Sequence, residues 1–137
     1  MRRRVLIPLL LAVAAPAFAA DPGEATEEFR ARQAQTIWNL QVLEGMVRPM
    51  PDPGSERPTP PAVAAYGRLL SENIAALQRL DLAGATDEQR RQAAEGWQAL
   101  AVHLRDLASL ARNRRLDRFA QLLTELETRC RTAVKQL

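Results

Sequence analysis

The final stretch of the chain, LDRFAQLLTELETRCRTAVKQL at residues 116–137, carries the clearest structural signal in the sequence. Its apolar side chains recur every three or four residues, which is the spacing of one face of an α-helix. The pattern predicts an amphipathic helix over 116–136 that packs its apolar face against other elements. That face consists of Phe119, Leu122, Leu123, Leu126, Cys130, Ala133, Val134 and Leu137.

Three segments upstream repeat this spacing. Thr86 followed by Gln89 is the pattern of a capping box at the start of one of them. Asn113, among the arginines that close the same segment, is expected to adopt a left-handed cap. A three-helix domain with a loose first helix is disfavoured, because the first segment is as apolar as the rest. The sequence predicts an all-α fold, an antiparallel four-helix bundle with up-down-up-down connectivity. The other three helices are expected at about 24–48, 62–80 and 87–112.

Residues 49–61 separate the first two helices and hold six of the nine prolines. A helix does not continue through such a segment, because each proline lacks an N–H donor and disfavours helix in the residue before it. We expect a long crossover loop. It is either a simple connection or a recognition segment, and the sequence does not decide between them.

The first twenty residues have the layout of a secretory signal peptide. Three arginines are followed by an apolar run and then by Ala17-Phe18-Ala19, a small-residue cleavage pattern. The apolar run is shorter than the roughly 20 residues that span a bilayer, which disfavours an uncleaved anchor. We expect cleavage near residue 20, a single domain over 21–137 and a location in the periplasm, with no membrane span after cleavage.

Charge limits the possible partners. Without the three arginines of the leader, sixteen basic residues balance sixteen acidic ones. No basic patch then favours nucleic acid or an anionic membrane. The sole cysteine, Cys130, cannot form an internal disulfide, so the core must be held together by packing alone.

No catalytic or metal-binding constellation is evident. His103 is the only histidine, and it falls on the flank of its helix rather than on the apolar stripe. A di-iron site in a bundle needs two histidines besides its glutamates, so the glutamates of this chain do not predict one. These are Glu27, Glu28, Glu44, Glu125 and Glu127.

The first helix is apolar on two opposite sides. One side, which includes Phe29, Thr36 and Leu40, is expected to face the core. A helix with two apolar sides usually has a neighbour on each. The second side therefore predicts a homodimer interface, formed by Ala31, Trp38 and Val42.

The leader, the four helices, the long first crossover and the last helix together resemble the cytochrome c prime family of periplasmic haem proteins. In that family the last helix carries C-x-x-C-H, whose cysteines hold haem and whose histidine ligates the iron. Cys130 matches the first cysteine, whereas Ala133 and Val134 stand at the second cysteine and the histidine. In the first helix, Arg32 and Thr36 fall at the positions that line the distal side of the haem.

The resemblance implies a haem c cofactor, but the motif is degenerate here. Haem iron needs a nitrogen or sulfur ligand from the protein, and a valine offers neither. We expect no cofactor and a non-enzymatic protein of the periplasm that acts by binding or interaction. The alternative from the family is a haem-binding electron-transfer or gas-binding cytochrome. A third interpretation is a chaperone-like or metal-stress accessory bundle of the periplasm. The sequence identifies no specific ligand or partner.

Overall fold

Four α-helices form nearly all the secondary structure of residues 22–137, the part of the chain that the computed structural model describes. The predicted all-α four-helix bundle is confirmed, whereas the predicted signal peptide lies outside the described residues. No helix within residues 22–137 is both long enough and apolar enough to span a membrane. The helices are α1 (Pro22–Val47), α2 (Pro61–Gln78), α3 (Asp87–Asn113) and α4 (Asp117–Lys135).

The helix ends lie within two residues of the predicted ones. The capping box is confirmed, since the Thr86 side chain accepts a hydrogen bond from the N–H of Gln89 and the Gln89 side chain accepts one from the N–H of Thr86. The prediction that Asn113 is a left-handed cap is wrong. Asn113 is the last residue of α3, and Arg115 takes the left-handed conformation with φ 62°. The N–H of Leu116 then bonds the carbonyl of Ala111 at 2.9 Å, which completes a Schellman motif.

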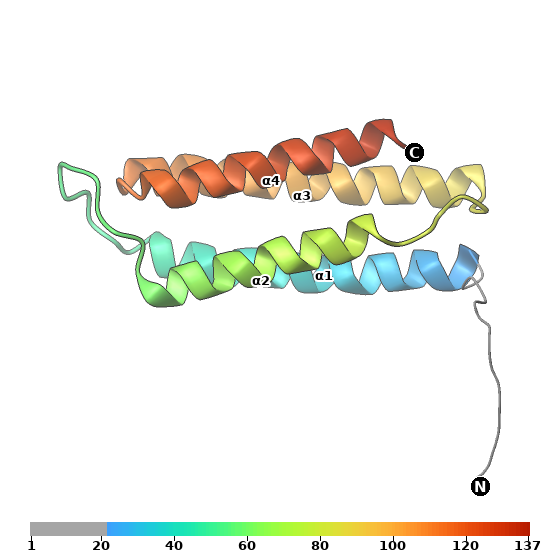
Figure 1. The fold of residues 1–137 in the computed structure, drawn as a ribbon, viewed down its shortest axis with the longest axis horizontal. Coiled ribbons are helices and arrows are strands. Elements are labelled where there is room, and N and C mark those ends of the chain that lie inside the picture. The colour runs from blue at the N-terminus through green and yellow to red at the C-terminus, as the bar shows by residue number, and fades with distance from the viewer. Residues whose placement is uncertain (1–21) are drawn as a thin grey trace, which may run out of the picture.

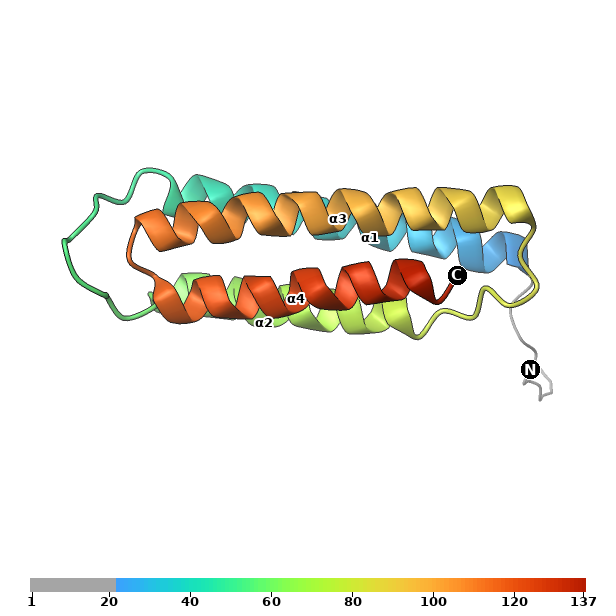
Figure 2. The same cartoon turned by 90° about the horizontal axis from the view of Figure 1, so that it is seen from above.

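Successive helices alternate in direction, as Figure 1 shows. Each helix has two neighbours: α1 packs against α2 and α3, and α4 packs against α3 and α2. Within residues 22–137 the backbones of α1 and α4, and those of α2 and α3, do not approach closely, so these pairs are diagonal. The connection from α2 to α3 therefore crosses the end of the bundle, so that α1 and α3 run side by side in the same direction (Figures 1 and 2).

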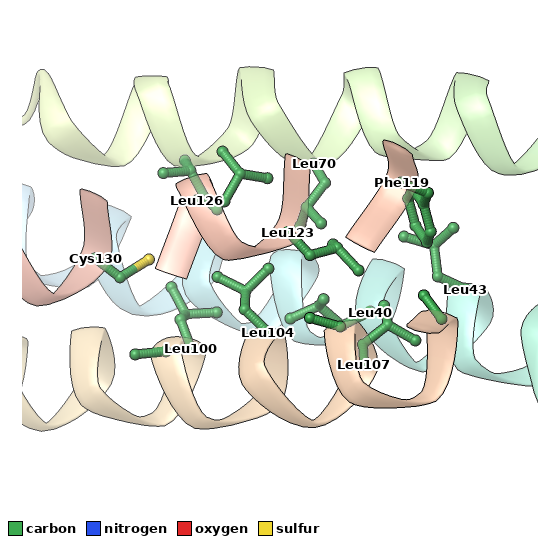
Figure 3. Packing of buried hydrophobic residues seen from close by; sticks show 14 of the residues in the cluster. Leu40, Leu43, Leu70, Leu100, Leu104, Leu107, Phe119, Leu123, Leu126 and Cys130 are labelled. Atoms are coloured by element: carbon green, nitrogen blue, oxygen red, sulfur yellow. The ribbon is translucent and has the colours of Figure 1, made fainter. Parts of the chain in front are cut away.

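The core is a continuous layer of apolar side chains between the four helices. Leucine is its commonest residue, and several leucines are fully buried, including Leu43, Leu70, Leu104 and Leu123 (Figure 3). Gly96 lets α1 approach α3 closely. A Cβ atom at this position would lie 2.8 Å from the Phe29 ring and 3.0 Å from Oε1 of Gln33.

The proline-rich crossover lies between α1 and α2 and is held to the turn between α3 and α4. The backbone N–H of Arg57 bonds the carbonyl of Arg115, and its Nε bonds the carbonyl of Arg114, both at 3.0 Å. Arg114 in turn donates to the carbonyl of Arg48 at 2.9 Å. These bonds close one end of the bundle.

Candidate functional site

Cys130, which the resemblance to cytochrome c prime places at a haem position, is sealed in the core. Its thiol has no solvent exposure, and Figure 3 shows the side chain among the leucines, close to Leu100 and Leu126. Burial raises the pKa of Cys130 to about 12, and the nearby Arg129 guanidinium lowers it by less. The thiol is therefore protonated at neutral pH and is a poor nucleophile.

The other family haem positions offer no ligand to iron. Ala133 is buried and Val134 is half-buried, and neither side chain carries a lone pair. His103 is exposed on α3, apart from the buried thiol. Because Cys130 is enclosed by packed leucines and no nitrogen ligand lies beside it, the residues at these positions do not fit a haem c.

The two distal positions are occupied by contacts within α1. The Thr36 side chain is fully buried, and its hydroxyl donates to the carbonyl of Arg32 at 2.7 Å. Arg32 itself is exposed and pairs with Glu28 at 2.7 Å.

His103 lines a shallow groove of about 230 Å³ between α1 and α3, together with Glu44, Arg48 and Asp106. Carboxylates beside a histidine suggest metal binding. However, no three His, Cys, Asp or Glu side chains within the described residues are placed to hold an ion. The Glu44 carboxylate pairs with Arg48.

The predicted interface residues lie on the outside of the bundle. Trp38 is 58% exposed, Ala31 is exposed and Val42 is half-buried. The other tryptophan, Trp97, is 3% exposed and packs edge-on against the ring of Phe29, with the ring centroids 5.4 Å apart. One tryptophan thus belongs to the core and the other to the surface.

Sequence reasoning missed two polar side chains of the interior. Asn39 on α1 is 1% exposed, and its Nδ2 has no hydrogen-bond partner. On α2 the Nδ2 of Asn73 is likewise buried and unpaired. The signal was available, because Asn39 falls three residues after Thr36 and beside Leu40, on the apolar stripe of α1.

A second opening, the end pocket, lies at the end of the bundle away from the crossover. It measures about 570 Å³ and is formed where α2 and α4 end, beside the connection from α2 to α3. Ala133 is the one family haem position that lines it. The lining residues are Leu77, Gln78, Leu80, Asp81, Leu82, Ala83, Arg90, Trp97, Ala133, Gln136 and Leu137.

The geometry thus offers an exposed apolar face on α1 and an end pocket, while Cys130 is closed off in the core. A comparison of the chain with family models, curated proteins and solved structures finds no match. The function is therefore inferred from the chain's own residues.

Proposed function

We propose that this protein is a haem-free, non-enzymatic bundle of the cytochrome c prime type, which is exported to the periplasm and acts there by binding. The closed core around Cys130 supports the absence of haem, since the thiol is buried among leucines. The alternating helices and the long first crossover support the resemblance. The binding surface is the outer face of α1, and its first partner is a second copy of the chain.

The exposure of Trp38 carries this proposal. Among the large apolar side chains within residues 22–137 it is the most exposed, at 58%. A tryptophan in this setting is typical of the centre of a protein interface. Small and apolar residues on this side of the helix form what we call the outer α1 face, and the exposed, uncharged Gln35 and Gln41 flank Trp38 there. The face consists of Ala31, Ala34, Trp38, Val42 and Gly45.

The outer α1 face suits a second copy because it carries no charge. No charged residue occurs between Arg32 and Glu44 along the helix. A two-fold dimer brings the same patch of both subunits together, so like charges would oppose each other and an uncharged patch avoids this cost. A Cβ atom at Gly45 would have no neighbour within 4 Å, so the monomer leaves open space at this position of the face.

Light scattering coupled to size exclusion tests the homodimer. We expect the wild-type protein to have twice the monomer mass at tens of micromolar, and the Trp38→Glu variant to have the monomer mass, because a buried unpaired carboxylate opposes association. Val102→Glu is the matched control, since Val102 is 41% exposed on α3. A monomeric wild type, or an unchanged mass in Trp38→Glu, contradicts the proposal.

The absorption spectrum and the intact mass test the other two parts. Protein expressed to the periplasm together with the haem-attachment machinery should show no Soret band and should stay colourless with added haemin. The intact mass should correspond to a chain that begins near residue 21, with no adduct on Cys130. A Soret band would restore the haem-binding alternative, whereas an uncleaved mass would contradict export by a cleaved leader.

A further inference from the structure

We propose that the end of the bundle at the proline-rich crossover binds an acidic segment of a partner protein. This surface, which we call the basic end, consists of residues 48–60 and 112–118. The crossover and the α3–α4 turn lie together there, at one end of the bundle (Figures 1 and 2). The inference does not depend on the homodimer, because the outer α1 face lies along the side of the bundle.

Charge is distributed unevenly between the basic end and the rest of the molecule. The basic end holds six arginines and three carboxylates, whereas the remainder of residues 22–137 holds ten basic and twelve acidic residues. The near-neutral balance of the whole sequence averages these two regions and hides the difference. An excess of one sign on one surface attracts a partner of the opposite sign. The six arginines are Arg48, Arg57, Arg112, Arg114, Arg115 and Arg118.

Five of these six arginines form no ion pair within residues 22–137. The exception is Arg48, which pairs with Glu44. Two of the five donate only to backbone carbonyls: Arg57 binds those of Pro51 and Arg114, and Arg114 binds that of Arg48. These bonds hold the two arginines in place and leave their positive charge without a carboxylate beside it.

The other three unpaired arginines are free for a partner. Arg112, Arg115 and Arg118 are exposed, and their side chains form no hydrogen bond within the described part of the chain. Arg112 lies in the last turn of α3, where the helix dipole favours a cation. Arg118 lies in the first turn of α4, where the dipole disfavours one, so helix stability does not account for it. Free guanidinium groups bind carboxylates through two parallel hydrogen bonds.

The placement of the arginines suits a series of carboxylates better than a single anion. Arg57 and Arg118 line a hollow of about 530 Å³, together with Thr59 and the carboxylate of Glu56. Because Glu56 offsets one of the two cations, the hollow by itself is a weak anion site. The remaining unpaired arginines lie outside the hollow. A partner must therefore carry several negative charges along its length to reach them.

A lipid surface suits the basic end less well than a polypeptide does. Surface helices that bind membranes combine basic residues with apolar side chains that enter the bilayer. The exposed large apolar side chains of the described residues all lie outside the basic end. They are Trp38, Leu69, Val102 and Leu137.

Fluorescence anisotropy of a labelled octaglutamate peptide tests the proposal, with protein purified after periplasmic expression of the full-length sequence. We expect saturable binding in about 20 mM sodium chloride and at least about fivefold weaker binding in about 200 mM, because salt screens exposed charges. Octaglutamine with the same label should not bind. No saturable binding of octaglutamate overturns the proposal. Co-sedimentation with phosphatidylglycerol vesicles beyond that with phosphatidylcholine vesicles also overturns it and assigns the surface to a membrane.

Two variants and a control locate the site. Arg118→Gln should weaken octaglutamate binding about threefold, and combining it with Arg112→Gln and Arg115→Asn should weaken it at least about tenfold. Asparagine suits position 115 because it tolerates the left-handed backbone there, with φ 62°. Arg79→Gln is the matched control, since Arg79 is exposed and forms no ion pair within residues 22–137, at the opposite end of α2.

Stability separates a binding role from a structural one. The urea midpoint of Arg118→Gln should not fall, because the substitution removes a cation from a helix start. Weaker binding by this variant is then not a result of unfolding. If the triple variant does not fold, Arg118→Gln decides alone. Unchanged binding in Arg118→Gln, or an equal loss in Arg79→Gln, contradicts the assignment of the site.

Discussion

The two helix pairs of the bundle differ in what they bury. In the α3–α4 pair the buried side chains are apolar, from Trp97 through Leu104 to Cys130. The α1–α2 pair buries Thr36 and Asn39, and it also encloses an unpaired nitrogen of Asn73. Both pairs contribute to one continuous core. The α3–α4 pair therefore has the composition of a scaffold, whereas α1–α2 departs from it at specific polar positions.

The outer surfaces of α3 and α1 also differ, because one is charged and the other is not. On α3, charged side chains alternate along the exposed face and form pairs such as Arg91 with Glu88 and Glu95. On α1 the outer face is uncharged and carries Trp38. Surface ion pairs add little stability but keep a helix face in water. This difference supports the proposal that the homodimer surface lies on α1 rather than on the helix that resembles the haem-bearing one.

Truncation of a core leucine in the α3–α4 pair should have the largest effect. Leu104 has no solvent exposure, so Leu104→Ala should lower the free energy of unfolding by about 2–5 kcal/mol through lost burial and the cavity left behind. Urea denaturation followed by circular dichroism measures this. Leu69→Ala is the control, because Leu69 on α2 is 39% exposed, and it should cost less than about 1 kcal/mol. Equal losses would mean that the core does not depend on this pair.

A polar atom introduced into the core of the α3–α4 pair should lower the free energy of unfolding by less than Leu104→Ala does, but by a measurable amount. Cys130→Ser places a hydroxyl among leucines and should lower the free energy of unfolding by about 2 kcal/mol. Cys130→Ala, which loses volume but adds no polar group, is the matched control and should cost less. If the serine variant were as stable as the wild type, water would have to reach this position and the contrast between the two pairs would fail.

The fold followed from the sequence because helix period, caps and proline positions are local properties. Residues 116–137 showed their inner face directly, and Thr86 with Gln89 located the start of α3. Which helices become neighbours did not follow, since a connection such as 79–86 is long enough to cross the end of the bundle as well as to follow its side. The left-handed residue of the α3–α4 turn was misplaced for a related reason, because α3 runs through Asn113.

The candidate sites were predictable in part. The outer α1 face could be predicted from Trp38, because an apolar residue opposite an apolar stripe has no place in the core. Asn39 was not predicted, since one amide within a run of apolar residues leaves the helical pattern intact. The end pocket could not be predicted, because Leu77, Trp97 and Leu137 come together only when α2, α3 and α4 pack.

The free energy of unfolding should fall at alkaline pH, because the buried Cys130 thiol of the α3–α4 pair keeps its proton. Burial raises the pKa of this thiol from 9.0 to about 12. Between these values the unfolded chain releases the proton while the folded chain keeps it, so the thiol's contribution to stability is complete below pH 9 and is lost as the pH rises towards 12. At pH 10 the loss relative to pH 7 should be larger in wild type than in Cys130→Ala, by about 1 kcal/mol. Urea midpoints at the two pH values measure it, and equal losses would contradict a sealed thiol.

The smallest expected effect is a gain in stability rather than a loss, and it tests the interior of the α1–α2 pair. Asn39→Leu removes a buried donor that has no partner, so the variant should be more stable than wild type by about 1 kcal/mol. Part of this gain, about 0.5 kcal/mol, comes from the higher helix propensity of leucine. Gln35→Leu, on the exposed side of the same helix, is the control and should change stability by less than about 0.5 kcal/mol.

A loss of stability in Asn39→Leu would show that the amide has a partner in solution, such as a bound water, and that the α1–α2 interior is hydrated. If Asn39→Leu were more stable but formed the dimer more weakly, the amide would instead help to set the position of the outer α1 face. Asn39 directly follows Trp38, so repacking at one residue can rotate the other. Unfolding and dimer mass should therefore be measured on the same Asn39→Leu variant. The two measurements distinguish whether Asn39 only lowers stability or also keeps the outer α1 face in position.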